Sequence, residues 1–226
     1  MNNLMKTAGR TGNAGSLLFS GTDSSIEANN ISHPDAFTYS CFIKSLGSTG
    51  NTQVIFVYDN GRPFNILIGI GTTLSIVIAI PSIDGINQTV ITSPDNLVTY
   101  NKWHNIICTG IKSSRCDCYV DGVWKFGQNI TQNIFYNNGL PLRIGRRSLT
   151  KISRQFNGYI NNCKVYNRAV GANEAKLLSQ GLPISRVGLL GEWKMNEMSG
   201  TTAYDTSGNG NHGTIVGATY STDKPF

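Results

Sequence analysis

The stretch Phe37-Thr38-Tyr39-Ser40-Cys41-Phe42-Ile43-Lys44 carries the period that decides the fold class. Its odd positions are apolar and its even positions are mostly polar, which is the alternation of a strand that buries one face. Similar stretches recur along the chain, separated by turn pairs such as Asn60-Gly61 and Asp121-Gly122, whose residues tolerate positive φ. Strands are predicted at residues 37–44, 54–58, 64–70, 74–80, 103–111, 115–120, 123–126, 140–144, 156–165, 189–195 and 214–216.

One helix is predicted over residues 172–179 (ANEAKLLS), because Gly181 and Pro183 follow it and end helices. The composition agrees with a turn-rich β protein, since glycine supplies 25 of the 226 residues and charged residues only 14%. Length alone does not distinguish one large sandwich from two small domains. Together the patterns predict an all-β sandwich with one short helix.

The N-terminus and the charge limit the classes of partner. Residues 1–15 (MNNLMKTAGRTGNAG) lack the apolar centre of a secretion signal and predict a flexible arm. No run approaches the roughly 18 apolar residues of a membrane span. A net charge of +6 is a mild bias toward anionic partners. We expect a protein made in a cytoplasm, with neither membrane nor nucleic acid as a partner.

The five cysteines are odd in number, which argues against a disulfide framework in a chain without an export signal. Cys116 and Cys118 share one face of a predicted strand with Val120, so all three are candidate core residues. We expect buried free thiols. A metal site is the alternative, although zinc sites usually use wider cysteine spacings.

Several motifs resemble those of laminin-G-like jelly-roll domains in the concanavalin A-like lectin/glucanase superfamily. Residues 37–44 resemble the family's FTISAWVK strand, residues 103–106 (WHNI) its WHHVA, and residues 118–122 (CYVDG) its LYVDG. Residues 156–169 resemble FNGYIDEVRIYNRAL, and residues 174–178 match the short helix that follows it. The pieces occur in the family's order, and the resemblance implies a concanavalin A-like jelly-roll β-sandwich.

The last segment of the chain resembles the family's first. Residues 188–213 (GLLGEWKMNEMSGTTAYDTSGNGNHG) are similar to its opening, GYWPFDEGSGTTAYDSSGNGNHG, and residues 16–23 (SLLFSGTD) to ALSFDGTDD, which normally follows that opening. This order predicts a permuted sandwich over residues 16–226 in which residues 187–217 supply the strand and loop that are normally N-terminal. Two alternatives stay open: exchange of the segment between subunits of a homo-oligomer, and a truncated second domain.

Catalysis is not expected. Glucanases of this family carry acidic residues at alternate positions of one strand, as in E-x-D-x-x-E, and the sequence has no such run. Glu192 and Glu197 are five positions apart and fall on opposite faces of a regular strand. We predict that the protein is not an enzyme.

The loop of residues 205–213 (DTSGNGNHG) is a candidate structural calcium site by resemblance. Asp205 would supply a carboxylate, and Asn209 and Asn211 would supply further oxygens. Calcium requires about six to eight oxygen ligands, and the loop holds one carboxylate. The alternative is a plain tight loop whose glycines supply positive φ.

Aromatic residues near predicted turns are candidates for sugar binding. Trp124, Tyr58 and Tyr136 are placed where exposed rings could stack on a saccharide. Core packing is the alternative, and we expect it to account for Trp103 and Trp193. A basic stretch at residues 143–154 (RIGRRSLTKISR) could contact an acidic surface or a polyanion, or could be a solvated loop.

A laminin-G-like module without an export signal fits phage structural proteins, which assemble in the host cytoplasm and are released by lysis. We therefore predict a non-catalytic virion surface protein, as a capsid decoration, head-fibre or tail-fibre component. Its lectin-like domain would bind host surface glycans or other virion proteins. The alternative is a carbohydrate-binding module of a larger secreted bacterial protein, located outside the cell. Both rest partly on analogy at the level of fold.

Overall fold

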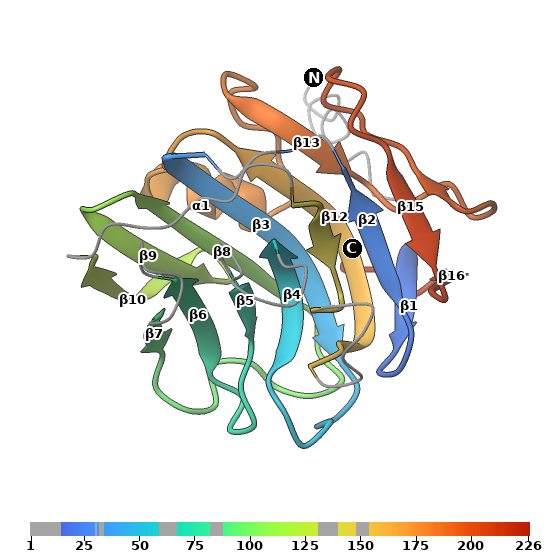
Figure 1. The fold of residues 1–226 in the computed structure, drawn as a ribbon, viewed down its shortest axis with the longest axis horizontal. Helices are drawn as coiled ribbons and strands as arrows, with labels where there is room; N and C mark the ends of the chain where they lie inside the picture. The colour runs from blue at the N-terminus through green and yellow to red at the C-terminus, as the bar shows by residue number, and fades with distance from the viewer. Residues whose placement is uncertain are drawn as a thin grey trace, which may run out of the picture.

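The computed structural model describes residues 15–29, 31, 34–58, 67–81, 88–130, 140–147 and 154–226. Within these residues, sixteen strands form two eight-stranded antiparallel sheets, with a single helix, α1 (Ala172–Ser179), beside them (Figure 1). The predicted all-β sandwich with one short helix is confirmed, and the helix has the predicted bounds. Among the described residues no helix has the length and apolarity that crossing a membrane requires.

Sheet A contains the strand that decides the fold class, β3, near its centre. Its strands are ordered β10, β9, β8, β3, β12, β1 and β16, with β13 paired in addition to β12. Their bounds are β1 (Ser16–Ser20), β3 (Ala36–Ser45), β8 (His104–Ile111), β9 (Arg115–Val120), β10 (Val123–Asn129), β12 (Asn157–Tyr166), β13 (Leu189–Trp193) and β16 (Thr219–Ser221).

Sheet B faces sheet A across the core. Its order is β14, β15, β2, β11, β4, β5, β6 and β7. The bounds are β2 (Ser25–Ala28), β4 (Gln53–Tyr58), β5 (Leu67–Ile70), β6 (Ile76–Pro81), β7 (Gln88–Thr92), β11 (Leu142–Ile144), β14 (Thr202–Ala203) and β15 (Gly213–Val216).

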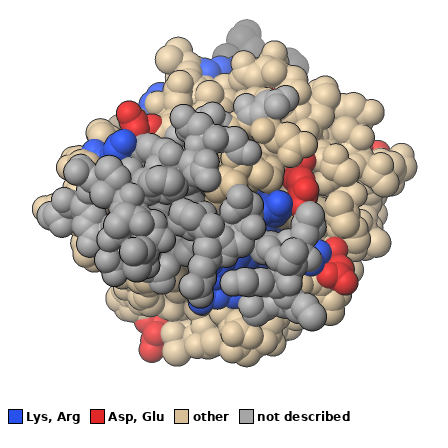
Figure 2. All heavy atoms as spheres, in the orientation of Figure 1, with Lys and Arg blue, Asp and Glu red and all other residues tan. Residues whose placement is uncertain are grey.

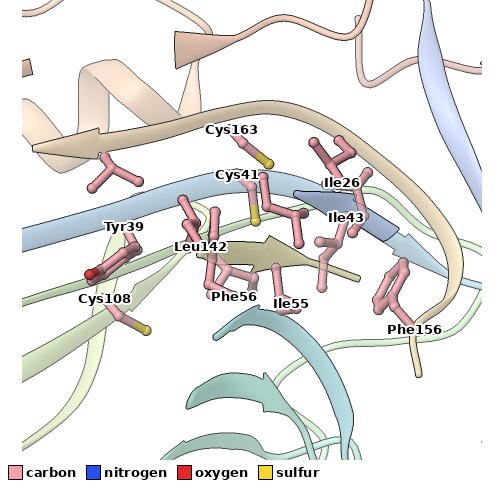
Figure 3. Close-up of a cluster of buried hydrophobic side chains, with 14 of the residues drawn as sticks. Ile26, Tyr39, Cys41, Ile43, Ile55, Phe56, Cys108, Leu142, Phe156 and Cys163 are labelled. Atoms are coloured by element: carbon pink, nitrogen blue, oxygen red, sulfur yellow. The ribbon is translucent and has the colours of Figure 1, made fainter. Parts of the chain in front are cut away.

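The alternation that predicted β3 places its side chains as expected. Phe37, Tyr39, Cys41 and Ile43 all point into the core between the sheets and are almost fully buried. Figure 3 shows part of this core, where Tyr39 and Cys41 lie opposite side chains of sheet B such as Phe56. Burial of these apolar side chains is the main favourable term that holds the two sheets together.

All five cysteines are buried and free, as predicted. Cys41, Cys108 and Cys163 lie in the core shown in Figure 3. Burial raises the pKa of the Cys108, Cys116 and Cys163 thiols well above the ordinary value, since the thiolate loses its hydration in an apolar environment. The thiols are therefore protonated core groups at neutral pH.

The C-terminal segment adds strands to both sheets of its own chain. β13 pairs with the second half of β12 along the edge whose first half pairs with β1. β15 pairs with β2 in sheet B, and β16 pairs with β1 in sheet A. The segment that resembles the family's opening thus completes this sandwich within one chain, while the permuted order relative to the family stays a prediction.

Candidate functional site

The hairpin of β9 and β10 builds the candidate site at one edge of sheet A. Asp121 and Gly122 connect the strands with φ values of 53° and 76°. Two consecutive positive φ values are typical of a tight turn whose twist matches the strands, which the Asp-Gly pair predicts. The alternation of β9 then sends one set of side chains into the core, namely Cys116, Cys118 and Val120. The other set lies on the opposite face of the sheet: Arg115 and Asp117 reach solvent, whereas Tyr119 is buried against α1.

Trp124 of β10 stands on this outer face. It pairs across the hairpin with Tyr119, and a register shift follows before Phe126, which packs against the core. The Trp124 side chain is half exposed, at 50%. Its indole Nε1–H donates to Asp117 Oδ1 at 2.8 Å, so the ring is held in one orientation. An exposed aromatic ring with a fixed orientation is a preformed apolar platform.

Asp117 and Arg115 form an ion pair beside the indole. Arg115 Nε lies 3.0 Å from each Asp117 carboxylate oxygen, and Arg115 Nη2 lies 2.9 Å from Oδ1. Hydrogen bonding to the carboxylate raises the pKa of Arg115. Gly127 faces the pair across the hairpin. A β-carbon added at Gly127 would overlap Asp117 Oδ1 and lie 2.6 Å from Arg115 Nη2. The missing side chain at Gly127 therefore lets the pair lie close to the sheet.

A hollow of about 220 Å³ opens next to this pair. Its lining is Thr109, Gly110, Ile111, Ser114, Arg115, Asp117, Tyr119, Ala169 and Val170. The loop before α1 forms one wall, fixed by the Val170 N–H, which donates to the hydroxyls of Thr38 and Thr109 at 3.1 and 3.0 Å. Burial and the nearby Asp117 charge raise the pKa of Tyr119, so its phenol keeps its proton.

A second aspartate, Asp205, organises the loop that follows β13 and β14. Its Oδ1 accepts the backbone N–H groups of Glu192 at 2.9 Å and Ser207 at 2.8 Å. Its Oδ2 accepts the Asn211 N–H at 2.9 Å and the Ser207 hydroxyl at 2.7 Å. Burial by itself would raise the pKa of Asp205, but these hydrogen bonds outweigh it and hold the pKa below the ordinary value.

The asparagines of the loop fasten it to β13. Asn209 Nδ2 donates to the carbonyls of Leu189 and Leu190 at 2.8 and 3.1 Å, and Asn211 Nδ2 donates to Leu190 at 2.9 Å. The Asn211 carbonyl in turn accepts the Trp193 indole N–H at 2.9 Å. These hydrogen bonds hold the loop against β13, the strand that carries the buried Trp193.

Residues 20–176 match the model of the Laminin_G_3 family, described as the concanavalin A-like lectin/glucanases superfamily. The chain belongs to this superfamily. The match includes the whole β9–β10 hairpin and ends before β13. Among curated protein sequences, none matches the chain.

Solved structures share the concanavalin A-like fold. A Bacteroides ovatus protein, provisionally described as carbohydrate-binding, is 18% identical with a TM-score of 0.71, over 93% of this chain and 60% of its own. The Ruminococcus gnavus sialidase domain CBM40, bound to sialyllactose, is 12% identical with a TM-score of 0.59 (73% and 96% covered). Domain 4 of the Geobacillus stearothermophilus arabinanase AbnA, with arabinotriose, is 15% identical with a TM-score of 0.58 (73% and 76%). The chain spans less than two thirds of the B. ovatus protein.

The predicted calcium ligands Asp205, Asn209 and Asn211 come together, but their arrangement does not fit the ion. Both carboxylate oxygens of Asp205 already face N–H and O–H donors, and both asparagines turn an Nδ2 donor onto β13. The described residues contain no group of three or more His, Cys, Asp or Glu that could hold a metal. Gly208 and Gly210 have φ values of 98° and 73°, as the tight-loop alternative requires.

The three predicted sugar-binding aromatics have different outcomes. Trp124 is exposed on the outer face of sheet A, as a stacking residue must be. Tyr58 is 0% exposed and packs against Tyr39, so its prediction as an exposed ring is wrong. It lies at the end of β4, and its ring faces the opposite sheet. Tyr136 lies outside the described residues.

The described part of the basic stretch includes two arginines that are less exposed than those of a solvated loop. Arg143 and Arg146 are buried, and they pair with Glu27 at 2.9 Å and Asp23 at 3.2 Å. On the face drawn in Figure 2, basic side chains gather near the middle, beside acidic ones. For these two arginines the solvated-loop interpretation is wrong, and residues 148–153 of the stretch lie outside the described part.

Arg115, Asp117 and Tyr119 were missed by the sequence reasoning, which assigned only the core face of β9. The signal was present, because residues that alternate with Cys116 and Cys118 must face outward. The cross-strand pairing of Trp124 with this face follows from the Asp-Gly turn. The position of the loop before α1, which closes the hollow, has no local signal in the sequence.

Proposed function

We propose that this lectin-like domain binds glycans at the hollow beside Trp124, without catalysing a reaction on them. The observation that carries the proposal is a half-exposed indole whose N–H is fixed to Asp117, next to a hollow lined by both polar and apolar groups. Sugars present apolar C–H faces and a rim of hydroxyls. A fixed aromatic ring flanked by hydrogen-bonding groups matches both features.

The rigidity of this site supports binding. Trp124 and Arg115 are both anchored on Asp117, and Asp117 lies against the backbone of Gly127. Side chains that are already ordered lose little entropy when a ligand docks, and this favours affinity. The fold agrees with the proposal, since two of the similar structures hold saccharides.

The absence of catalysis is part of the proposal. Glycoside hydrolysis ordinarily needs two carboxyl groups on opposite sides of the scissile bond, about 5–9.5 Å apart. Among the described residues that line the hollow, Asp117 is the one carboxylate, and it is occupied by Arg115 and Trp124. Release of reducing sugar from common β-glucans by the purified protein would contradict this part of the proposal.

The test is a glycan array followed by calorimetric titration of the strongest binder. Trp124→Ala should weaken binding about tenfold or more, because about 1.4 kcal/mol of stacking corresponds to a factor of ten. Tyr204→Ala is the matched control, since Tyr204 is similarly exposed, at 55%, on the distant C-terminal loop. Equal affinity of Trp124→Ala and the unaltered protein, or no binding to any glycan, would refute the site.

Display on a virion is the finer part of the proposal. Five buried free thiols need no disulfide-forming compartment, which is compatible with assembly in a cytoplasm. Mass spectrometry of particles purified from a lysate of the source should then detect the chain in stoichiometric amount. Its presence in the culture medium as part of a longer secreted protein would favour the carbohydrate-binding module of a bacterial protein instead.

A further inference from the structure

The charges inside the hollow cancel. Of the nine described residues that line it, Arg115 and Asp117 are charged, and they pair with each other. Arg115 Nε lies 3.0 Å from both carboxylate oxygens of Asp117. Arg115 Nη2 lies 2.9 Å from Oδ1. The described lining therefore offers a ligand neither a net charge nor an arginine that lacks a carboxylate partner.

The hydrogen-bonding capacity that remains is mixed. Asp117 Oδ2 accepts one hydrogen bond from the described residues, from Arg115 Nε, although a carboxylate oxygen can accept about two. Arg115 Nη1 makes one long hydrogen bond of 3.5 Å, to Asn129 Oδ1, and so can donate to a ligand as well. An acceptor and a donor side by side are the complement of hydroxyl groups, which both donate and accept.

An acidic sugar would find this arrangement unfavourable. Its carboxylate would have to compete with Asp117 for Arg115 and would then lie close to the Asp117 charge. Two like charges about 4 Å apart repel appreciably at a protein surface, and Arg115 and Asp117 could separate only by breaking the hydrogen bonds between them. A neutral sugar has no such cost.

We infer that the hollow takes an uncharged saccharide, with two adjacent hydroxyls on the Arg115–Asp117 pair and its apolar ring face on Trp124. This rests on the proposed function and names its ligand class. The overall charge of +6 does not oppose it. Long-range charge increases the encounter rate of anions and is screened by salt, whereas the choice between ligands depends on contacts at the site.

The experiment compares two forms of one ligand. The strongest neutral oligosaccharide from the array is titrated beside the same oligosaccharide oxidised at C6 to the uronic acid. We expect the oxidised form to bind about tenfold more weakly than the neutral form at low salt. The ratio of their dissociation constants should decrease in high salt, because salt screens the repulsion. Asp117→Asn removes the carboxylate charge and keeps an acceptor for the Trp124 indole. The ratio of the two dissociation constants should then fall to about three or less.

Asp23→Asn is the matched control, because Asp23 is an exposed carboxylate outside the hollow, paired with Arg146, and should leave the ratio unchanged. Urea unfolding of each variant checks that it folds, and the salt dependence of the unaltered protein provides a test that needs no variant. Equal or tighter binding of the oxidised form, lost in Trp124→Ala, would overturn the inference and leave glycan binding intact. Binding of neither form, with no glycan on the array affected by Trp124→Ala, would overturn both.

Discussion

Two regions of the molecule pair a tryptophan with an aspartate, and they use the pair in opposite ways. On the β9–β10 hairpin, Trp124 is 50% exposed and donates directly to Asp117. At the end of β13, Trp193 is 0% exposed and forms a backbone bridge with Asp205 of the C-terminal loop, while its indole donates to the Asn211 carbonyl. The same residue types thus serve an outward surface in one region and the interior in the other.

The difference lies in how completely each carboxylate is satisfied. Asp205 accepts two donors on each oxygen, all from its own loop or from β13. Asp117 lines the hollow and accepts donors mainly on Oδ1, so its Oδ2 keeps acceptor capacity. A saturated inward carboxylate stabilises the fold, whereas a partly satisfied outward one is available to a ligand. Substitutions should therefore affect stability in the first region and binding in the second.

Removal of the whole C-terminal segment should have the largest effect. A chain ending at Gly181 lacks β13, β14, β15 and β16, and so loses the buried side chains of Trp193, Met195, Ala203 and Ile215. It also leaves the second half of one β12 edge and one edge of β2 without a partner strand. We expect the truncated chain to lose cooperative urea unfolding, measured by circular dichroism.

The solution mass of the intact chain separates two origins of this effect. A monomer of 24.5 kDa in light scattering shows that the segment docks on its own sandwich. A defined oligomer that dissociates on truncation would instead show exchange of the segment between subunits. A truncated chain as stable as the intact one would contradict the structural role of this region.

Asp205→Ala should have the next largest effect. It leaves three backbone N–H groups and one hydroxyl without their acceptor, and we expect a loss on the order of 3 kcal/mol in the free energy of unfolding. Urea titration measures it, with Asp95→Ala as the control, because Asp95 is exposed. Glycan affinity should stay unchanged, because the hairpin is a separate region.

Thiol labelling would locate this destabilisation. Cys163 of β12 pairs directly with Trp193 of β13, whereas Cys116 and Cys118 belong to the hairpin. If β13 opens locally because the loop no longer holds it, Cys163 should react with a thiol reagent faster than the hairpin cysteines. Uniform acceleration at all three would mean that Asp205 acts on global stability alone.

The sequence predicted the elements that carry a clear period. β3, β9 and α1 agree with their expected residues to within one position at each end. β1, β2, β7, β14 and β16 were missed, because strands of two to five residues are too short to show a clear alternation.

The site was predicted only in part. Trp124 could be placed because a recognisable turn precedes it, and Tyr58 was misplaced by the same reasoning because its burial depends on Tyr39 of the opposite sheet. The residues of the calcium hypothesis do lie together in one loop, but the sequence does not show that the amides of Asn209 and Asn211 donate to β13. Contacts between segments far apart in the chain have no local pattern.

A smaller effect, confined to binding, is expected from Gly127→Ala. The added β-carbon would displace the ends of Asp117 and Arg115, both of which can swing away at little cost to the fold. We expect glycan affinity to fall about three- to tenfold, because the pair loses its fixed position, while the free energy of unfolding changes by less than about 1 kcal/mol. Gly171→Ala is the control, since nothing lies within 4 Å of a β-carbon there. Unchanged affinity would show that the ligand does not use the pair.

Calcium should have the smallest effect, because the Asp205 carboxylate already accepts four protein donors. A site with a dissociation constant of about 1 mM would add roughly 1.4 kcal/mol at 10 mM calcium, and raise the melting temperature by about 3–6 °C. We expect a shift of less than about 1 °C between 10 mM calcium chloride and EDTA, measured by scanning calorimetry. A larger rise that disappears in Asp205→Asn would show that the loop exchanges its N–H donors for the ion. The inward aspartate would then serve a ligand as well as the fold, and the contrast with Asp117 would be one of degree.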